Sequence, residues 1–429
     1  MRYSPIPNQL FKKNRDKLRR MLPANAMAVF LSNDPMPSHG DLSFRFRQNS
    51  DFFYLTGIDQ EESMLILYPD GPKEEWKEIL FVRETNEHLA TWEGEKLSKE
   101  QACERSGIEH VVWSSHFDAI RHQCMLMADS VYLNTNENTR FQSDVPTRGF
   151  RFARQMRSSY PLHDFRRAAP LMKTLRQIKE PEEVSLMKTA CGITRDALAE
   201  VLHFVKPGVL EYEIEGLMTG YFLQRGANGH AYHPIVASGK DTCVLHYEKN
   251  DKICQDGDLL LMDFGCEYAY YASDLTRTVP VSGTYTGEQR EVYQAVLQVM
   301  KEAIPMLQPG TTLEAYEKKV GASMEEKLLA LGLLTQQDID EQTEEQPAYR
   351  KYFMHGTSHY MGIDVHDVGT KFDTLKAGMV FSCEPGIYIR DKGLGVRLEN
   401  DILITAEGPV DLMADIPIEP DDIEAQMRS

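Results

Sequence analysis

Two aspartates, Asp263 and Asp274, have the type and spacing that could do chemistry. Asp263 ends the apolar run Leu-Leu-Leu-Met, and Asp274 begins the strand-like stretch Asp-Leu-Thr-Arg-Thr-Val. A two-residue turn at Tyr268 and Ala269 would place the two carboxylates directly opposite each other, with Cβ atoms about 4.5–5.5 Å apart. Carboxylates that close repel each other and need a shared proton or a cation. The pair therefore predicts a cation site, with a structural loop as the alternative.

Two glutamates repeat this pattern further along the chain. Glu384 ends the apolar run Val-Phe-Ser-Cys, and Glu399 follows in Val-Arg-Leu-Glu-Asn. In a single strand through this second run, Arg397 and Glu399 share one face. Arg397 could then steady a carboxylate cluster from behind. Taken alone, each glutamate also fits an ordinary surface or hairpin position.

Three of the thirteen histidines, His355, His359 and His366, fall within twelve residues. The HxxxH pair lacks the glutamate of HExxH, so the helix of that zinc-protease class is excluded. Gly356 and Gly362 interrupt the segment and predict a loop. A structural cluster is the alternative reading of the histidines.

Together these residues supply four carboxylates and one or more imidazoles. Such donors suit Mn(II), Co(II), Fe(II) or Zn(II), and carboxylates can bridge two ions. A pair of ions about 3.5–4 Å apart can deprotonate a bridging water and polarise a carbonyl, which amide hydrolysis requires. The sequence has no GxSxG elbow, no GxxxxGK phosphate loop and no cysteine with an evident activating partner. The pattern favours metal-assisted hydrolysis.

We expect two domains, the first third of the chain forming one of them, because 429 residues exceed what one hydrophobic core usually serves. Short apolar strands alternate with helical patterns, which is typical of an α/β domain. A basic amphipathic helix is predicted over residues 9–21, and strands are predicted over 26–31, 64–68, 79–82, 110–113 and 130–133.

The second part begins near residue 172, so we expect domains at 1–172 and 173–429. Pro181 suits the first turn of a helix, and Glu182 and Glu183 suit its positive end. Further on, Pro207-Gly208 and Pro309-Gly310 each precede a helical pattern and then a loop with histidine, His233 or His355. The match is either chance or the trace of two similar halves facing each other across a cleft.

Composition limits the partners and the compartment. A net charge of −18 disfavours nucleic acid, which needs a basic footprint, and also disfavours anionic membranes. No run of about 18 apolar residues could span a membrane, and no signal-peptide pattern opens the sequence. Seven scattered cysteines without a CxxC pair suit a reducing compartment. We expect a cytoplasmic protein.

From about residue 175 to its end, the sequence resembles the pita-bread metallopeptidases. The matching pieces, in order, are Ile-Val-Ala-Ser-Gly239 with Leu-His246-Tyr, Asp263-Phe-Gly-Cys with Ser-Asp274-Leu-Thr-Arg, His355-Gly through His359 to Asp-Val-His366-Asp, Glu384-Pro-Gly-Ile-Tyr388, and Arg397-Leu-Glu399. The first third resembles the creatinase-like N-terminal domain in Phe46-Arg-Gln-Asn-Ser-Asp-Phe-Phe-Tyr-Leu-Thr-Gly57. This second match points to the aminopeptidase P group of that family.

The resemblance implies a fold with an α/β creatinase-like N-terminal domain and an α+β pita-bread catalytic domain. It also implies two divalent ions, Mn(II) first, with Co(II), Zn(II) or Fe(II) as alternatives. The implied ligands are Asp263 on one ion, His359 and Glu384 on the other, and Asp274 and Glu399 bridging both.

The resemblance further assigns roles around the ions. Glu384 would take the proton of the attacking water, and His366 would contact the scissile carbonyl or its tetrahedral product. His246 would face the substrate and handle protons, and His355 would form a wall of the proline pocket. Tyr388 and Arg397 would support the ligands.

The activity implied is hydrolysis of the bond between an N-terminal residue and a following proline, in peptides with proline second. A prolidase limited to Xaa-Pro dipeptides shares the same ligands and is the nearest alternative. A metal-free, creatinase-like or binding-only protein is a remote one, because all five ligand positions hold competent side chains. Relatives assemble as homodimers or homotetramers, so we expect a homo-oligomer. The compact stretches 368–378 and 389–396 leave subsites beyond proline open.

Overall fold

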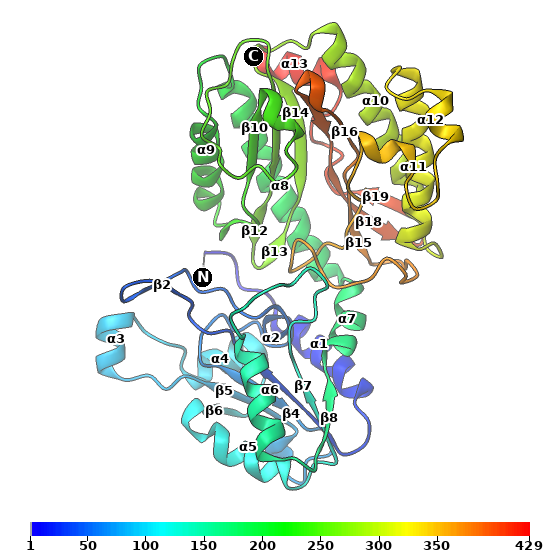
Figure 1. Cartoon of the computed structure of the whole chain (residues 1–429). Coiled ribbons are helices and arrows are strands. Elements are labelled where there is room, and N and C mark those ends of the chain that lie inside the picture. Colours follow the sequence, from blue (N-terminus) through cyan, green and yellow to red (C-terminus); the bar gives the residue numbers. More distant parts are fainter. Residues whose placement is uncertain (1) are drawn as a thin grey trace. The chain divides into compact units, whose positions relative to one another are not determined.

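The computed structural model describes residues 2–429, which form two compact units (Figure 1). The first unit is Pro5–Arg176, and the second is Gln177–Ser429 together with residues 2–4. The division falls near the end of helix α7 (Ala169–Gln177), a few residues after the expected boundary at 172. The end of α7 is tied into the first unit, because Arg176 forms an ion pair of 2.8 Å with Asp51 and the Leu175 carbonyl accepts the Tyr54 hydroxyl.

The first unit is an α/β domain around a six-stranded mixed sheet of order β6-β5-β4-β1-β7-β8. The predicted strands are all present, and each lies within two residues of its expected bounds. The strands of this unit are β1 (Ala26–Leu31), β2 (Pro37–His39), β3 (Leu42–Ser43), β4 (Met64–Leu67), β5 (Glu78–Val82), β6 (Val111–Trp113), β7 (Ser130–Leu133) and β8 (Asp164–Arg167). Its helices are α1 (Asn8–Met21), α2 (Ser50–Thr56), α3 (Glu87–Glu93), α4 (Lys99–Ser106), α5 (Phe117–Met125), α6 (Arg148–Ser159) and α7.

The second unit contains two three-stranded antiparallel sheets of order β10-β11-β14 and β15-β18-β19. Its strands are β9 (Gly229–His230), β10 (Ile235–Ser238), β11 (Leu259–Phe264), β12 (Cys266–Tyr268), β13 (Tyr271–Ala272), β14 (Leu275–Pro280), β15 (Val380–Cys383), β16 (Gly386–Ile389), β17 (Leu394–Arg397), β18 (Asn400–Thr405) and β19 (Gly408–Asp411). Its helices are α8 (Pro181–Phe204), α9 (Glu211–Gln224), α10 (Gly287–Ala303), α11 (Leu313–Ala330), α12 (Gln336–Asp340) and α13 (Pro420–Arg428). Helices and antiparallel sheets are thus combined as the α+β expectation requires.

The helices enclose the sheets with their apolar faces. Helix α8 begins at Pro181 as predicted, and it contacts α9, β12 and β13. Helix α10 contacts α11, β16 and β17. In Figure 1 the green helix α9 lies beside β10, and the yellow helix α11 lies beside α10. One apolar core joins both sheets to these helices.

The internal repeat suggested by the sequence is present as matching backbone geometry. Gly208 and Gly310 both have left-handed backbones, with φ of +94° and +93°. The Gly208 N–H donates to the Cys254 carbonyl, and the Gly310 N–H donates to the Leu375 carbonyl. Each glycine is followed by a helix, α9 or α11, and later by a sheet. The second unit is therefore built from two similar halves.

The predicted hairpin turn is wrong by one position. Asp263 pairs with Thr276 rather than with Asp274, and the turn lies at Ala269 and Tyr270, whose φ angles are +52° and +73°. Positive φ at both positions is typical of the type I′ turn that closes two-residue hairpins. The observed register avoids placing like charges directly opposite each other. Moving the turn by one position changes the residue paired with Asp263 by two, from Asp274 to Thr276. Because side chains alternate between faces along a strand, Asp274 stays on the same face of the sheet as Asp263.

The predicted strand through Glu399 is also interrupted. β17 ends at Arg397 and pairs with β16, whereas β18 begins at Asn400 and pairs with β15 and β19. Glu399 lies in the break, where its N–H donates to the Thr276 carbonyl. The break passes the chain from one strand pair to another and leaves Glu399 beside β14.

Residues 2–4 pack against the second unit. The Tyr3 ring meets Tyr268 of β12 edge-on, with ring centroids 6.2 Å apart. The Arg2 carbonyl lies beside Gly226, where a Cβ would stand 2.7 Å from the carbonyl oxygen. Gly226 also has a φ of +80°, so both the close approach and the backbone favour glycine there.

Candidate metal centre

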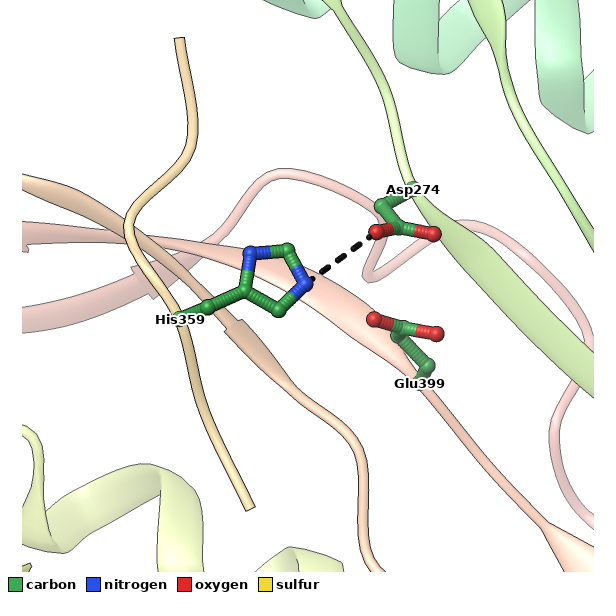
Figure 2. Close-up of side chains that lie close together, drawn as sticks. All are labelled: Asp274, His359 and Glu399. Atoms are coloured by element: carbon green, nitrogen blue, oxygen red, sulfur yellow. Dashed lines mark ion pairs between the residues drawn. The ribbon is translucent and has the colours of Figure 1, made fainter. Parts of the chain in front are cut away.

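Three predicted ligands, Asp274, His359 and Glu399, converge in the second unit (Figure 2). One ligand atom from each lies within 4.8 Å of the others. The Nε2 atom of His359 lies 3.3 Å from a carboxylate oxygen of Asp274. Figure 2 shows the imidazole and both carboxylates directed at a common point.

The other two predicted ligands, Asp263 and Glu384, join the same cluster. The Tyr232 hydroxyl lies 2.7 Å from Asp263 Oδ1 and also contacts Asp274 Oδ1. Glu384 Oε1 lies 3.6 Å from His359 Nε2. The fold therefore brings together all five side chains that the sequence singled out, across 136 residues from Asp263 to Glu399.

The two sheets position the four carboxylates at strand ends. Asp263 lies at the penultimate position of β11, and Asp274 immediately precedes β14. Glu384 immediately follows β15, and Glu399 immediately precedes β18. Arg277 is fully buried and donates to the Glu399 carbonyl, which fixes the backbone of that residue.

The clustered carboxylates destabilise one another as anions and need shared protons or a cation. Burial and the neighbouring Asp263 raise the pKa of the Asp274 carboxyl well above its usual range. Burial, with Asp274 and Glu384 nearby, does the same to the pKa of Glu399, and burial raises the pKa of Glu384 to about 7. Among the described residues, Glu399 Oε1 is buried and has no hydrogen-bond partner. An acidic cluster with an unsatisfied oxygen fits divalent cations, which remove the repulsion.

His359 is oriented as a ligand through Nε2. Its Nδ1 lies 3.1 Å from the Tyr360 carbonyl, which can only accept, so Nδ1 carries the proton. The lone pair of Nε2 then faces the carboxylates of Asp274 and Glu384, the usual orientation of a metal-binding histidine. The His366 ring meets His359 edge-on at 4.4 Å between centroids, and its side chain is exposed.

Arg397, Tyr388 and His355 form a chain of hydrogen bonds behind the cluster. Arg397 donates to Asp263 at 2.6 Å and to the Tyr388 hydroxyl at 2.9 Å. The Tyr388 hydroxyl lies 2.7 Å from His355 Nε2. Burial and Arg397 lower the pKa of His355 to about 3, so this imidazole stays neutral. His355 Nδ1 then donates to the Gly356 carbonyl, and the Tyr388 hydroxyl donates to Nε2.

His246, like His366, lies less deeply than the other predicted residues. Its side chain is exposed, and in the described part of the chain no hydrogen bond joins it to the carboxylates. It lies near enough to influence His355 electrostatically. Its neighbour Tyr247 is buried and donates to Glu211 at 2.8 Å.

Two residues of the site were missed by the sequence reasoning. Tyr232 bridges Asp263 and Asp274 from the loop before β10, where the repeat had drawn attention to His233 instead. Asp401 is fully buried on β18 and accepts the backbone N–H of Asp274 at 3.2 Å. Neither residue belongs to a motif with a recognisable spacing. Asp401 could still have been noticed in the sequence, because it is a charged residue within an apolar strand.

Comparison with known proteins places this geometry in a family. Residues 185–406 match the Metallopeptidase family M24, and residues 11–132 match the aminopeptidase P N-terminal domain. The chain belongs to this metallopeptidase family. It is 34% identical to the Xaa-Pro aminopeptidase of Escherichia coli over 99% of this chain and 98% of that protein. It is also 34% identical to the Xaa-Pro aminopeptidase of Haemophilus influenzae, with the same coverage.

A solved structure of the Escherichia coli aminopeptidase P with the inhibitor Pro-Leu matches with a TM-score of 0.88 at 32% identity. The match covers 99% of both chains. The predicted two-domain fold, an N-terminal aminopeptidase P domain and a pita-bread catalytic domain, is thereby confirmed. The chain is a metallo-aminopeptidase that uses divalent ions, and the prolidase alternative is not favoured. No helix among residues 2–429 is both long and apolar enough to cross a membrane.

Proposed function

We propose that this metallopeptidase hydrolyses the bond between an N-terminal residue and a following proline, with two divalent ions at the carboxylate cluster. The observation that carries the proposal is the convergence of four carboxylates and one imidazole in a chain matched end to end by Xaa-Pro aminopeptidases. Its substrates are peptides whose second residue is proline.

The five converging side chains would hold the ions. Asp263 would bind one ion and His359 with Glu384 the other, while Asp274 and Glu399 bridge both. The Nε2 atom of His359 and the unpartnered Oε1 of Glu399 support this assignment. The bound ions would supply an activated water and a polarised scissile carbonyl.

Glu384 acts as the general base in this proposal. It lies at the edge of the cluster, where one carboxylate oxygen faces His359 and the other lies 3.7 Å from His355 Nδ1. A carboxylate there can take a proton from the attacking water and later pass it to the leaving proline nitrogen. Removal of this carboxylate should therefore reduce turnover more than ion binding.

The exposed histidines serve the substrate side. His366 is exposed, with its ring edge-on to that of His359, and would stabilise negative charge on the carbonyl oxygen as water attacks. His246 is exposed near His355 and would handle protons at the substrate. His355 stays neutral and would form a wall for the proline ring, held by Tyr388. Arg397 and Tyr388 keep the ligands in place.

Three finer features belong to the same proposal. Mn(II) is the ion we expect first, with Co(II), Zn(II) and Fe(II) as alternatives for this oxygen-rich donor set. A cytoplasmic location is supported by the seven cysteines, each of which is a free thiol. We also expect a homodimer or homotetramer, without nucleic-acid or membrane partners, and light scattering measures this directly.

The deciding experiment compares peptides on metal-stripped protein. Ala-Pro, Ala-Pro-Ala and Ala-Ala-Ala are incubated with the stripped protein alone and after addition of Mn(II), Co(II) or Zn(II). We expect release of alanine from Ala-Pro-Ala only after metal addition, and no cleavage of Ala-Ala-Ala. The Glu384→Gln variant should retain metal and lose about 10²–10⁴-fold in turnover.

Each alternative has its own outcome in this assay. Cleavage of Ala-Pro with Ala-Pro-Ala left intact would identify a strict dipeptidase. Full activity after EDTA treatment and dialysis would remove the metal mechanism. Unchanged turnover of Glu384→Gln would remove that residue as the base.

A further inference from the structure

Glu317 on helix α11 contacts the loop that carries the predicted ligand His359. Its Oε1 accepts the Thr357 backbone N–H at 2.7 Å, and its Oε2 accepts the Thr357 hydroxyl at 3.1 Å. The Ser358 backbone also donates to this carboxylate. Burial raises the pKa of Glu317, as expected for a carboxylate placed inside the fold. Glu317 does not contact the four clustered carboxylates, so the mechanism above does not use it.

The peptide unit held by Glu317 is held from its other side as well. The Thr357 carbonyl accepts the N–H of Glu384 at 2.8 Å, and Thr357 is fully buried. Thr357 therefore connects the carboxylate of helix α11 to the backbone of the proposed general base. Two residues on, the His359 N–H donates to the Ser382 hydroxyl at 3.1 Å.

This loop is bonded to the segment around β15 through its carbonyls, because those of Thr357 and His359 accept the N–H groups of Glu384 and Ser382. Residues 355–359 belong to no helix and no named strand. Backbone N–H groups outside regular structure need other acceptors when they are buried. Glu317 supplies an acceptor for two successive N–H groups, those of Thr357 and Ser358. Its removal would leave both groups without that acceptor, in the segment between His355 and His359.

The other half of the unit has a corresponding anchor. Glu211, at the start of α9, is fully buried and accepts the Ser238 N–H and the Lys252 N–H. It also accepts the Tyr247 hydroxyl beside His246. In both halves, then, a glutamate from the helix after the Pro-Gly turn holds the segment that carries a functional histidine.

We propose that Glu317 is a positioning residue, which sets His359 and His355 relative to Glu384 by holding the Thr357–Ser358 backbone. The kinetic part of this inference rests on the proposed aminopeptidase function. The metal-binding part does not, because affinity for Mn(II) can be measured without turnover.

The test compares Glu317→Ala and Glu317→Gln with Glu326→Ala, a control that removes an exposed glutamate of the same helix. Titration calorimetry of stripped protein with Mn(II) measures affinity, and hydrolysis of Ala-Pro-Ala measures kcat and KM. For Glu317→Ala we expect Mn(II) affinity to fall about 10–100-fold, as for other residues that support ligands. We expect kcat to fall by up to about 100-fold with a smaller change in KM, because the reacting groups are displaced.

Glu317→Gln should recover most of both losses, since its amide oxygen can still accept the Thr357 N–H. The proposal is overturned if Glu317→Ala melts at a lower temperature yet keeps wild-type Mn(II) affinity and kcat. Should Glu317→Ala fail to fold, Glu317→Asp replaces it, because its carboxylate is one methylene short of the loop. Wild-type affinity in Glu317→Asp would then contradict the proposal, and reduced affinity would support it.

A wild-type protein without activity on Ala-Pro-Ala would remove the proposed function. The comparison of Mn(II) affinities would still decide the role of Glu317.

Discussion

The two halves of the catalytic unit place carboxylates by the same backbone plan. In the first half, Asp263 follows Gly257 by six residues, and in the second half Glu384 follows Gly378 by six. Both glycines have left-handed backbones, with φ of +83° and +89°. Asp274 and Glu399 then each precede the next strand of their sheets. Each half thus contributes two carboxylates from neighbouring strands, and the four lie together in one cluster.

The halves differ in the segment beside the first strand of each pair. Ala237 lies opposite Leu261, two residues before Asp263. His359 lies beside Ser382, two residues before Glu384. An apolar residue of a packed strand in one half therefore corresponds to an imidazole on a loop in the other. The symmetry supplies the carboxylates of the proposed ligand set, and the departure from it supplies the one imidazole of that set.

Substitution of His359 should give the largest difference in metal binding between the two halves. In the proposed ligand set, His359→Ala removes the nitrogen ligand of the second-half ion and leaves Asp263 on the first-half ion. We expect loss of one of the two bound Mn(II) equivalents and a fall in affinity of more than about 100-fold for that ion, beyond the effect of a supporting residue. Metal analysis after dialysis measures both.

His233→Ala is the matched control, because it removes an exposed histidine from the loop of the first half. It should keep wild-type metal content. Equal metal content in His359→Ala and wild type would remove His359 from the ligand set.

The Arg397→Lys variant tests whether Arg397 holds Asp263, the proposed ligand from the first half, in place. Arg397 donates to Asp263 and to the Tyr388 hydroxyl with two different nitrogens, and one ammonium cannot reproduce that planar arrangement. We expect Mn(II) affinity to fall about 10–100-fold, measured by calorimetry. Arg428→Lys, at an exposed position on the last helix, should bind as the wild type does. An unchanged affinity for Arg397→Lys would restrict Arg397 to a packing role.

Substitution of Glu183 should change activity least, and it should change how the stability of the fold depends on pH. It is fully buried on α8, accepts the Tyr271 hydroxyl, and burial raises its pKa to about 7. The folded protein therefore holds a proton there that the unfolded chain releases above about pH 4.5. The stabilisation from this proton is complete below pH 4.5 and is lost as pH rises towards 7.

Glu183→Gln removes this titration. Between about pH 5 and 8, metal-free wild type should lose up to about 3 kcal/mol more stability than the variant does. Urea unfolding at a series of pH values measures the difference, and Glu200→Gln, an exposed change on α8, should behave as the wild type. Parallel pH curves for Glu183→Gln and wild type would contradict the protonated state of Glu183.

Much of this arrangement was predictable from particular residues. Apolar runs ending in Asp263 and Glu384 marked the strand ends, because a charge that closes a buried strand has to face a partner. Pro181 and the two Pro-Gly pairs marked helix starts, since proline and glycine restrict or release the backbone in known ways. The same apolar patterning predicted the strands of the first unit, and the structure confirms them.

The errors came from features that depend on distant contacts. The hairpin register was misplaced because Ala269 and Tyr270 adopt positive φ without the Asn-Gly or Asp-Gly signal of such turns. Tyr232 and Glu317 act through hydrogen bonds to segments far along the chain, and no local spacing encodes such bonds.

The packing of residues 2–4 has a consequence for synthesis of the chain. Because the 172 residues of Pro5–Arg176 intervene, the catalytic unit is assembled from two separate stretches of polypeptide. Tyr3 leaves the ribosome long before Tyr268 exists, so their contact closes a loop of more than 260 residues. Because closing so long a loop is entropically unfavourable, we expect this contact to form late in folding. Residues 2–4 are therefore expected to dock after the strands around Tyr268 have formed.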